Sequence, residues 1–85
     1  MTYAIVFTRS AFRALEQLPG RDQARIARRI DALAENPRPS GAKRLQGGQG
    51  EHRIRVGAYR IIYLIDDGQL IVTVIRLGDR KDIYR

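Results

Sequence analysis

The chain has 85 residues, enough for a single domain over residues 1–85 and too few for two. It has no Cys, one His and no apolar run longer than Ile61–Ile65, which excludes disulfides, thiolate zinc sites, cysteine nucleophiles and a transmembrane helix. Sixteen basic residues against nine acidic ones give a net charge of +7, which favours a nucleic acid or an acidic protein as partner. We therefore expect a cytoplasmic protein without a metal, a cofactor or a membrane anchor.

The first half of the chain predicts one strand and two helices. The β-branched and aromatic segment 3–7 is typical of a strand. Apolar residues then recur at helical spacing over residues 11–18, with Thr8 or Ser10 in position to cap the helix. Pro19-Gly20 ends this helix, and a second amphipathic segment, with its arginines largely opposite the apolar face, extends to residue 34.

The second half predicts strands only. A Gly-rich loop over residues 40–50 contains a candidate short edge strand at 42–45. The period then becomes two over residues 51–56, where His52, Ile54 and Val56 face one way. Gly57-Ala58 turns into a central strand over residues 59–65, and a turn at residues 66–68 leads to a last strand over 69–77.

These elements predict an α+β domain of order β-α-α-β-β-β. The three long strands form an antiparallel meander, and the two helices, joined by a short turn, form a hairpin that covers one face of the sheet. The other face is then exposed, and we expect the arginines on it or at its rim.

The sequence leaves two explanations open for several basic side chains. Arg53 and Arg55 lie two residues apart on one strand face and are either solvated charges or phosphate ligands. Like charges side by side weaken a sheet, which favours a functional reason. Arg60 interrupts the most apolar strand and either binds phosphate or pairs with a nearby Asp. Lys43 and Arg44 are either secondary phosphate contacts or solvated charges.

The aromatic residues and the single His divide in the same way. Tyr59 and Tyr63 share a strand face and are expected in the core, and His52 is expected as a structural residue on the helix-covered face. Near the C-terminus, Arg80 binds phosphate or pairs with a carboxylate, and Tyr84 is either functional or a packing residue.

The segments AKRLQG, EHRIRVGAYRIIYLIDDG and IVTVIRLGDRKDIYR, following a strand and a helical pair, resemble the RelE/ParE superfamily of bacterial toxins. The most specific parts are R-I-R-V-G-x-Y-R-I-I-Y and the closing G-x-R-x-x-x-Y, and the ending resembles the RelE branch. The resemblance covers essentially the whole chain. It implies a microbial RNase-like fold and an endoribonuclease, or mRNA interferase, that cleaves messenger RNA on the ribosome and inhibits translation. It also implies a cognate RelB-like antitoxin, for which we expect an acidic segment.

The resemblance assigns catalytic positions to Arg53, Arg55, Arg60, Arg80 and Tyr84. We add RNA-binding roles for Lys43, Arg44, Arg76 and Lys81 on charge alone. Metal-independent cleavage uses the 2′-hydroxyl as nucleophile and needs charge stabilisation at the phosphate, which guanidinium groups supply.

The sequence departs from the family pattern at two points. Some members carry lysines at the positions of Arg53 and Arg55, and often His at that of Asp79. Because arginine does not release its proton in proteins, Tyr84, Glu51, His52 and Asp79 are the titratable candidates, with Tyr84 preferred. A ParE-like poison of DNA gyrase and an inactive relative that binds only the antitoxin are the alternatives, although ParE-type chains usually lack the closing R-x-x-x-Y.

Overall fold

The structure of the chain is a computed structural model that describes residues 1–79. Its helices and strands follow the predicted order, including the short edge strand. They are β1 (Ala4–Phe7), α1 (Arg9–Glu16), α2 (Gly20–Ala32), β2 (Lys43–Arg44), β3 (His52–Val56), β4 (Tyr59–Asp66) and β5 (Ile71–Asp79).

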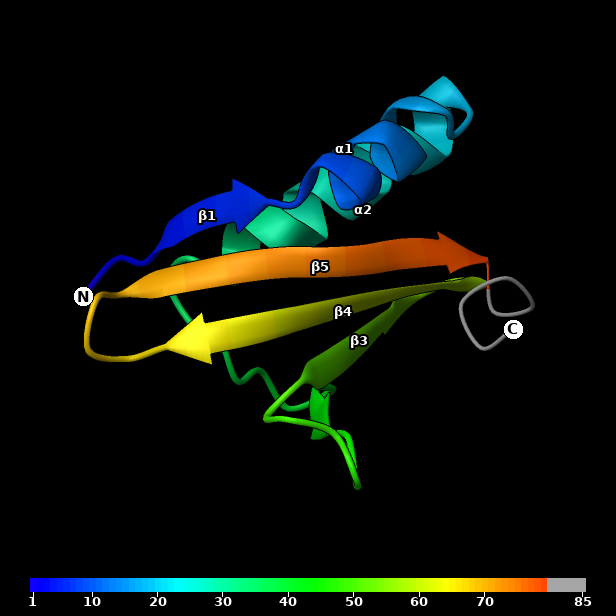
Figure 1. Ribbon diagram of the computed structural model, residues 1–85. Helices are drawn as coiled ribbons and strands as arrows, with labels where there is room; N and C mark the ends of the chain where they lie inside the picture. The colour runs from blue at the N-terminus through cyan, green and yellow to red at the C-terminus, as the bar shows by residue number, and fades with distance from the viewer. Residues whose placement is uncertain (80–85) are drawn as a thin grey trace.

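The strands form one five-stranded sheet in the order β1-β5-β4-β3-β2. The strands from β2 to β5 pair antiparallel, as the meander prediction required. β1 lies parallel to β5, with Ala4 opposite Ile71, so the complete sheet is mixed. Since the chain passes from β1 through both helices before it reaches β2 at the far edge, β1 is left beside the last strand rather than the next one (Figure 1).

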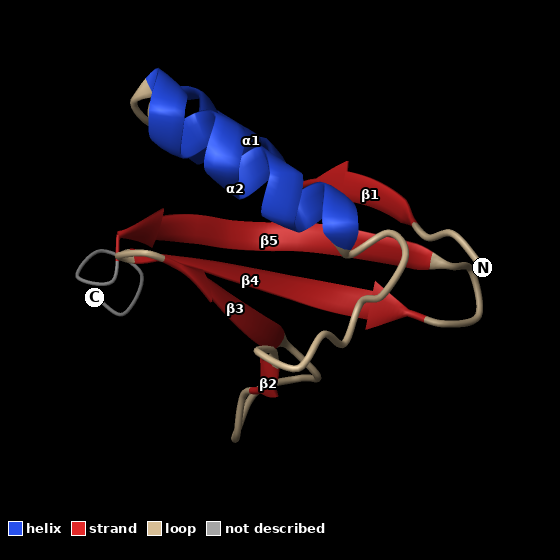
Figure 2. Cartoon of the chain, turned by 180° about the vertical axis from the view of Figure 1, so that it is seen from behind, coloured by secondary structure: helices blue, strands red, loops and turns tan. Residues whose placement is uncertain are grey.

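Both helices lie on the same side of the sheet and run side by side in opposite directions (Figures 1 and 2). Thr8 caps α1, because its side-chain oxygen accepts a hydrogen bond of 3.2 Å from the amide of Ala11. The core lies between the helices and the sheet, and its fully buried members include Ile26 and Ile30 of α2. The predicted helical hairpin over one face is therefore confirmed.

The turn before β5 differs from its predicted position. Asp66 still belongs to β4, and β5 begins at Ile71 rather than at residue 69. In this turn Leu70 has a positive φ of 56°, and the side chain of Asp66 accepts a hydrogen bond of 2.9 Å from the amide of Gln69. At its other end, β5 continues through Gly78 to Asp79, two residues beyond the end of the strand predicted over residues 69–77.

Two sets of polar contacts hold the loop after α2 against the sheet. The buried hydroxyl of Tyr63 donates a 2.7 Å hydrogen bond to the carbonyl oxygen of Pro37. Arg38 donates to both carboxylate oxygens of Asp67, at 3.2 and 2.8 Å, and the hydroxyl of Tyr3 donates to the same carboxylate at 2.6 Å. These contacts fix the loop on the helix side and leave the opposite face of the sheet to other residues.

Neither helix in the part of the chain described by the structure is long and apolar enough to cross a membrane.

Candidate functional site

A row of three basic residues crosses four strands on the face of the sheet opposite the helices. Lys43 of β2 pairs with Arg53 of β3, Arg53 pairs with Ile62 of β4, and Ile62 pairs with Arg76 of β5. Directly paired residues project from the same face, and their neighbours in sequence project from the other. Because Ile54 and Ile61 belong to the core under the helices, this row lies on the helix-free face.

A second row lies beside the first, toward the end of the sheet at which β5 finishes. Arg55 of β3 pairs with Arg60 of β4, and Arg60 pairs with Gly78 of β5. Since glycine has no side chain, the position beyond Arg60 carries only backbone. We call the five side chains of the two rows, Lys43, Arg53, Arg55, Arg60 and Arg76, the basic face.

Arg53 is buried within the basic face, with only 8% of the residue exposed. Its Nε is buried, and no atom of residues 1–79 accepts a hydrogen bond from it. A buried donor without an acceptor costs about 1–3 kcal/mol, so native proteins keep few of them. The solvated explanation for Arg53 is therefore wrong, whereas Arg55 is exposed.

Arg55 and Arg60 each have an interaction partner in the structure, as does Asp79. The salt-bridge explanation for Arg60 thus stays open beside the phosphate-ligand explanation. Both arginines lie in the same cross-strand row, and an oxyanion placed over that row meets guanidinium groups from two neighbouring strands.

Arg44 lies away from the basic face. It pairs with His52, which pairs with Tyr63, so these three residues share the helix side of the sheet. His52 stacks on Tyr63 with ring centroids 5.8 Å apart, and its Nδ1 lies 3.2 Å from the carbonyl oxygen of Gly50. The structural role expected for His52 is confirmed, and this His does not reach the basic face.

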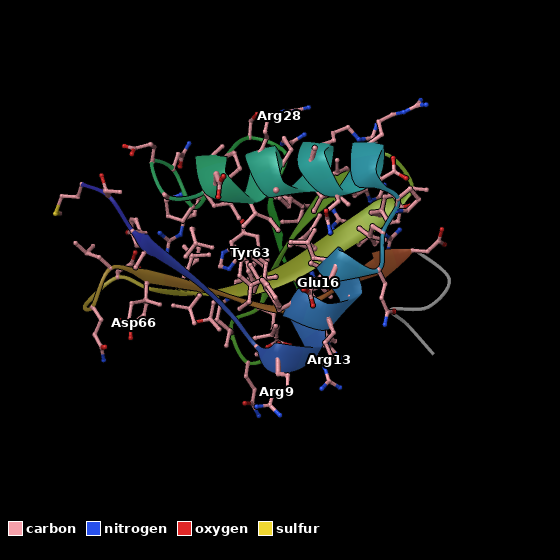
Figure 3. All side chains as sticks on the ribbon, turned by 90° about the horizontal axis from the view of Figure 1, so that it is seen from above. Arg9, Arg13, Glu16, Arg28, Tyr63 and Asp66 are labelled. Carbon is pink, nitrogen blue, oxygen red and sulfur yellow. The ribbon has the colours of Figure 1, made fainter. Side chains whose placement is uncertain are left out.

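The two tyrosines of β4 are structural, as expected. Tyr63 is fully buried, and burial raises the pKa of its phenol to about 12. Tyr59 donates a 2.9 Å hydrogen bond to Asp22 of α2, and this bond to a carboxylate raises its pKa. Neither phenol lies on the basic face, and neither is poised to lose a proton near neutral pH. In Figure 3, Tyr63 lies under the helices, whereas Arg28 projects outward from α2.

Arg80, Lys81 and Tyr84 fall outside the described residues, so their predicted roles stay predictions. β5 reaches Asp79 opposite Tyr59, one residue after Gly78 faces Arg60. The chain therefore leaves the described part of the fold at the end of the sheet that carries Arg55 and Arg60.

One part of this face was missed in the sequence. A hollow beside the first row is lined by Gly47, Gly48, Gln49, Glu51, Leu64 and Ile75. Two signals could have indicated it: Glu51 lies two residues before Arg53 on the same strand face, and a run of glycines precedes it. Over residues 1–79 no group of three or more His, Cys, Asp or Glu side chains could hold a metal ion.

Comparison with known proteins assigns the chain to a family. The sequence profile described as "ParE toxin of type II toxin-antitoxin system, parDE" matches residues 5–84. The chain belongs to this toxin family. The resemblance of its sequence to the RelE/ParE superfamily is thereby confirmed.

The similar proteins carry RelE-type names. Toxin RelG of Mycobacterium tuberculosis is 35% identical over 86 residues, which cover 100% of this chain and 99% of that protein. Toxin RelE of the same organism is 33% identical over 84 residues, covering 98% and 87%. The toxin–antitoxin complex RelBE2 of M. tuberculosis contains a chain that matches with a TM-score of 0.82 and 30% identity, covering 94% of this chain and 100% of that one.

An archaeal RelE–RelB complex from Pyrococcus horikoshii matches with a TM-score of 0.83 and 26% identity, covering 96% of this toxin chain and 99% of that chain. The agreement covers the whole small domain, with its two helices and mixed sheet, and therefore confirms the fold class predicted from the sequence.

Proposed function

We propose that this toxin is an endoribonuclease that cleaves messenger RNA on the ribosome and so arrests translation. The observation that carries the proposal is the basic face, in which Lys43, Arg53, Arg55, Arg60 and Arg76 occupy adjacent rows on the side of the sheet that the helices leave uncovered. The buried, unpartnered Nε of Arg53 supports it, because an anion on this face supplies the missing acceptor. The RelE names of the similar proteins support the same activity.

The proposed chemistry is attack of the 2′-hydroxyl on the adjacent phosphorus, with departure of the 5′-oxygen and no metal ion. Arg53 and Arg60 lie on neighbouring strands and are proposed to hold the phosphate and to stabilise the charge that develops on it. Arg55, which is exposed on the same face, is proposed to contact the phosphate as well. Arg80 is proposed as the fourth phosphate-binding arginine. Fixed guanidinium groups suit this role because they are charged at every physiological pH.

The proton transfers need other residues, because arginine retains its proton. Of the titratable candidates, His52 lies on the helix side, and Asp79 pairs with Tyr59 on that side. Glu51 turns its carboxylate toward the amide of Gln49. We therefore keep Tyr84 as the proposed residue that exchanges a proton with, or orients, the 2′-hydroxyl.

Lys43 and Arg76 lie at the two ends of the first row and are proposed to contact the RNA backbone on either side of the cleaved phosphate. Arg44 lies on the helix side of the sheet, away from the cleaved phosphate. It is therefore proposed to contact RNA at a different place from the residues of the basic face. Lys81 is proposed to bind RNA from outside the described residues.

The proposed partner is a RelB-like antitoxin with an acidic segment. Two of the matching structures are complexes of related toxins with their antitoxins, and the net charge of +7 suits an acidic chain that folds on binding. Action on the ribosome would place the toxin in the cytoplasm.

The test compares wild-type toxin with an Arg60→Gln variant and an Arg80→Ala, Tyr84→Phe double variant in a reconstituted translation reaction. Messenger 5′ ends are mapped with and without ribosomes. Cleavage inside translated frames that requires ribosomes and is lost in both variants supports the proposal.

The ParE name of the matching family favours gyrase inhibition as the second candidate function. The same preparations are therefore assayed for inhibition of DNA supercoiling by gyrase. Supercoiling inhibition without any RNA cleavage would replace the nuclease proposal, whereas inactivity in both assays would indicate a relative that only binds its antitoxin.

A further inference from the structure

The hollow lies beside the first row, on the same side of the sheet as the basic face. It has a volume of about 430 Å³ and is lined by Gly47, Gly48, Gln49, Glu51, Leu64 and Ile75. Leu64 follows Ile62 by two residues on β4, and Ile75 immediately precedes Arg76 on β5. Two residues along a strand span about 7 Å, so a group in the hollow lies roughly one nucleotide away from the first row.

Both apolar side chains and a polar loop line the hollow. Leu64 and Ile75 are partly buried and contribute hydrocarbon to the lining, while the Gly-rich loop contributes Gly47, Gly48 and Gln49. The volume falls within the roughly 300–1,000 Å³ of small-ligand pockets. A flat aromatic ring with polar edges suits such a site, because its face covers the hydrocarbon and its edge reaches the loop.

Glu51 supplies the charged group of the hollow. Its Oε1 accepts a hydrogen bond from the amide of Gln49, which folds the carboxylate back against the loop. A Cβ atom at Gly48 would lie 2.8 Å from Oε2, so the absence of a side chain there lets the carboxylate take this position. An ionised carboxylate has about four acceptor sites, and the bond to Gln49 leaves the others available.

We propose that the hollow formed by the 47–50 loop, Glu51, Leu64 and Ile75 is a nucleobase subsite in which the carboxylate of Glu51 selects guanine. This subsite rests on the proposed cleavage of RNA and extends it from the phosphate to an adjacent base. Guanine presents a ring N–H and an exocyclic amino group side by side on one edge, which match the oxygens of a carboxylate. Adenine and cytosine present an amino group beside an unprotonated ring nitrogen, and that nitrogen repels the carboxylate.

The direct test is an NMR titration of the isotope-labelled full chain with the 5′-monophosphates of guanosine, adenosine, cytidine and uridine. We expect guanosine monophosphate to shift the amide signals of Gly48, Glu51 and Leu64 and to bind about tenfold more tightly than adenosine monophosphate. Both nucleotides carry the same 5′-phosphate, so binding of the phosphate to the basic face cancels in the ratio of the two affinities. Equal affinities for all four nucleotides would overturn the proposal.

Two variants test the role of Glu51. Glu51→Gln keeps an oxygen for the amide of Gln49 but replaces the other acceptor by a donor, so the preference for guanine should disappear. Glu16→Gln, on α1, makes the same change of charge on the helix side and should leave the preference intact. If Glu51→Gln does not fold, Gly48→Ala displaces the carboxylate without any change of charge, and it should also abolish the preference. An unchanged preference in whichever variant folds refutes the role of Glu51.

Cleavage mapping separates this proposal from the proposed function. If wild-type toxin cleaves messages and Glu51→Gln cleaves them at an unchanged distribution of sites, the subsite is refuted and the nuclease stands. If wild-type toxin cleaves nothing, the nuclease is refuted, and the nucleotide titration still decides whether the hollow binds guanine.

Discussion

Replacement of Arg53 by Met should make the protein more stable and less active at once. Arg53 is 8% exposed, and its Nε lacks an acceptor within residues 1–79. Methionine keeps an unbranched apolar stem of similar reach and removes both the charge and the unpaired donor. The substitution therefore isolates the guanidinium group from the packing of its aliphatic part.

The expected gain in stability follows from the cost of the unpaired group. A buried donor without an acceptor costs about 1–3 kcal/mol, and part of this gain is offset by imperfect packing of the new side chain. We expect the free energy of unfolding to rise by about 1–2 kcal/mol. For a chain of this size, each kcal/mol corresponds to a rise of roughly 4–8 °C in Tm.

Cleavage should change in the opposite direction. Loss of one fixed donor to a developing oxyanion costs about 10²–10³-fold in rate, and we expect a loss of that size in the ribosome-dependent assay. The control is Arg28→Met on the outer surface of α2, where the side chain projects away from the sheet (Figure 3). Arg and Met have similar helix propensities, so stability should stay within about 0.5 kcal/mol.

Urea and thermal denaturation of the three proteins measure the stability, and single-turnover cleavage measures the activity. A loss of 1 kcal/mol or more in Arg53→Met would show that the guanidinium stabilises the fold, which contradicts the reasoning from its missing acceptor. Retention of full cleavage would remove Arg53 from the phosphate site.

Three further predictions concern polar contacts away from the basic face, in the loop after α2 and at the start of α1. Tyr63→Phe leaves the carbonyl of Pro37 without its donor and should lower the free energy of unfolding by about 1–3 kcal/mol, measured with urea. The hydrogen bond from Arg38 holds the pKa of Asp67 at about 2, below its ordinary value of 3.8, so the stability that this carboxylate contributes is present above pH 4 and is lost as the pH falls toward 2. Acid titration of Asp67→Asn should show a smaller loss over that interval. Thr8→Ala removes the cap of α1 and should cost about 0.5–2 kcal/mol, measured by the shift in Tm.

The spacing of apolar residues correctly predicted which side chains are buried between the helices and the sheet. Ile26 and Ile30 of α2, and Ile54 and Val56 of β3, are buried where their spacing places them. Local patterns suffice there because the helices and the sheet each present one apolar face, and burial of these faces against each other leaves little choice.

The parallel pairing of β1 could not be predicted in the same way. It depends on where the chain returns after two helices and three further strands, and nothing within Ala4–Phe7 encodes the direction of its neighbour. The hollow has a similar origin, since it joins a loop to β4 and β5 across a distance that no local pattern covers.

The position of Arg76 depends on an irregularity that alternation cannot reveal. Ile62 pairs with Arg76 and Tyr63 pairs with Val74, so Ile75 is an extra residue in β5. Strict alternation from the buried Val72 and Val74 would turn Arg76 toward the helices and Leu77 away from them. The bulge reverses this order, so that Leu77 is buried in the core and Arg76 joins the row of Lys43 and Arg53.

The departures from ordinary folding rules collect on one face. Arg53 buries a donor without an acceptor, Gly78 lies within a strand opposite Arg60, and the extra Ile75 interrupts the pairing beside Arg76. Each departure weakens the sheet locally, because an unpaired donor, a glycine and a bulge all give up interactions that a regular strand makes. On the helix side the same strands contribute buried apolar side chains to a continuous core. Sequences that specify a fold break such rules chiefly where a site requires it, so the distribution of these departures supports the proposal that the basic face binds RNA, and it does so without reference to any relative.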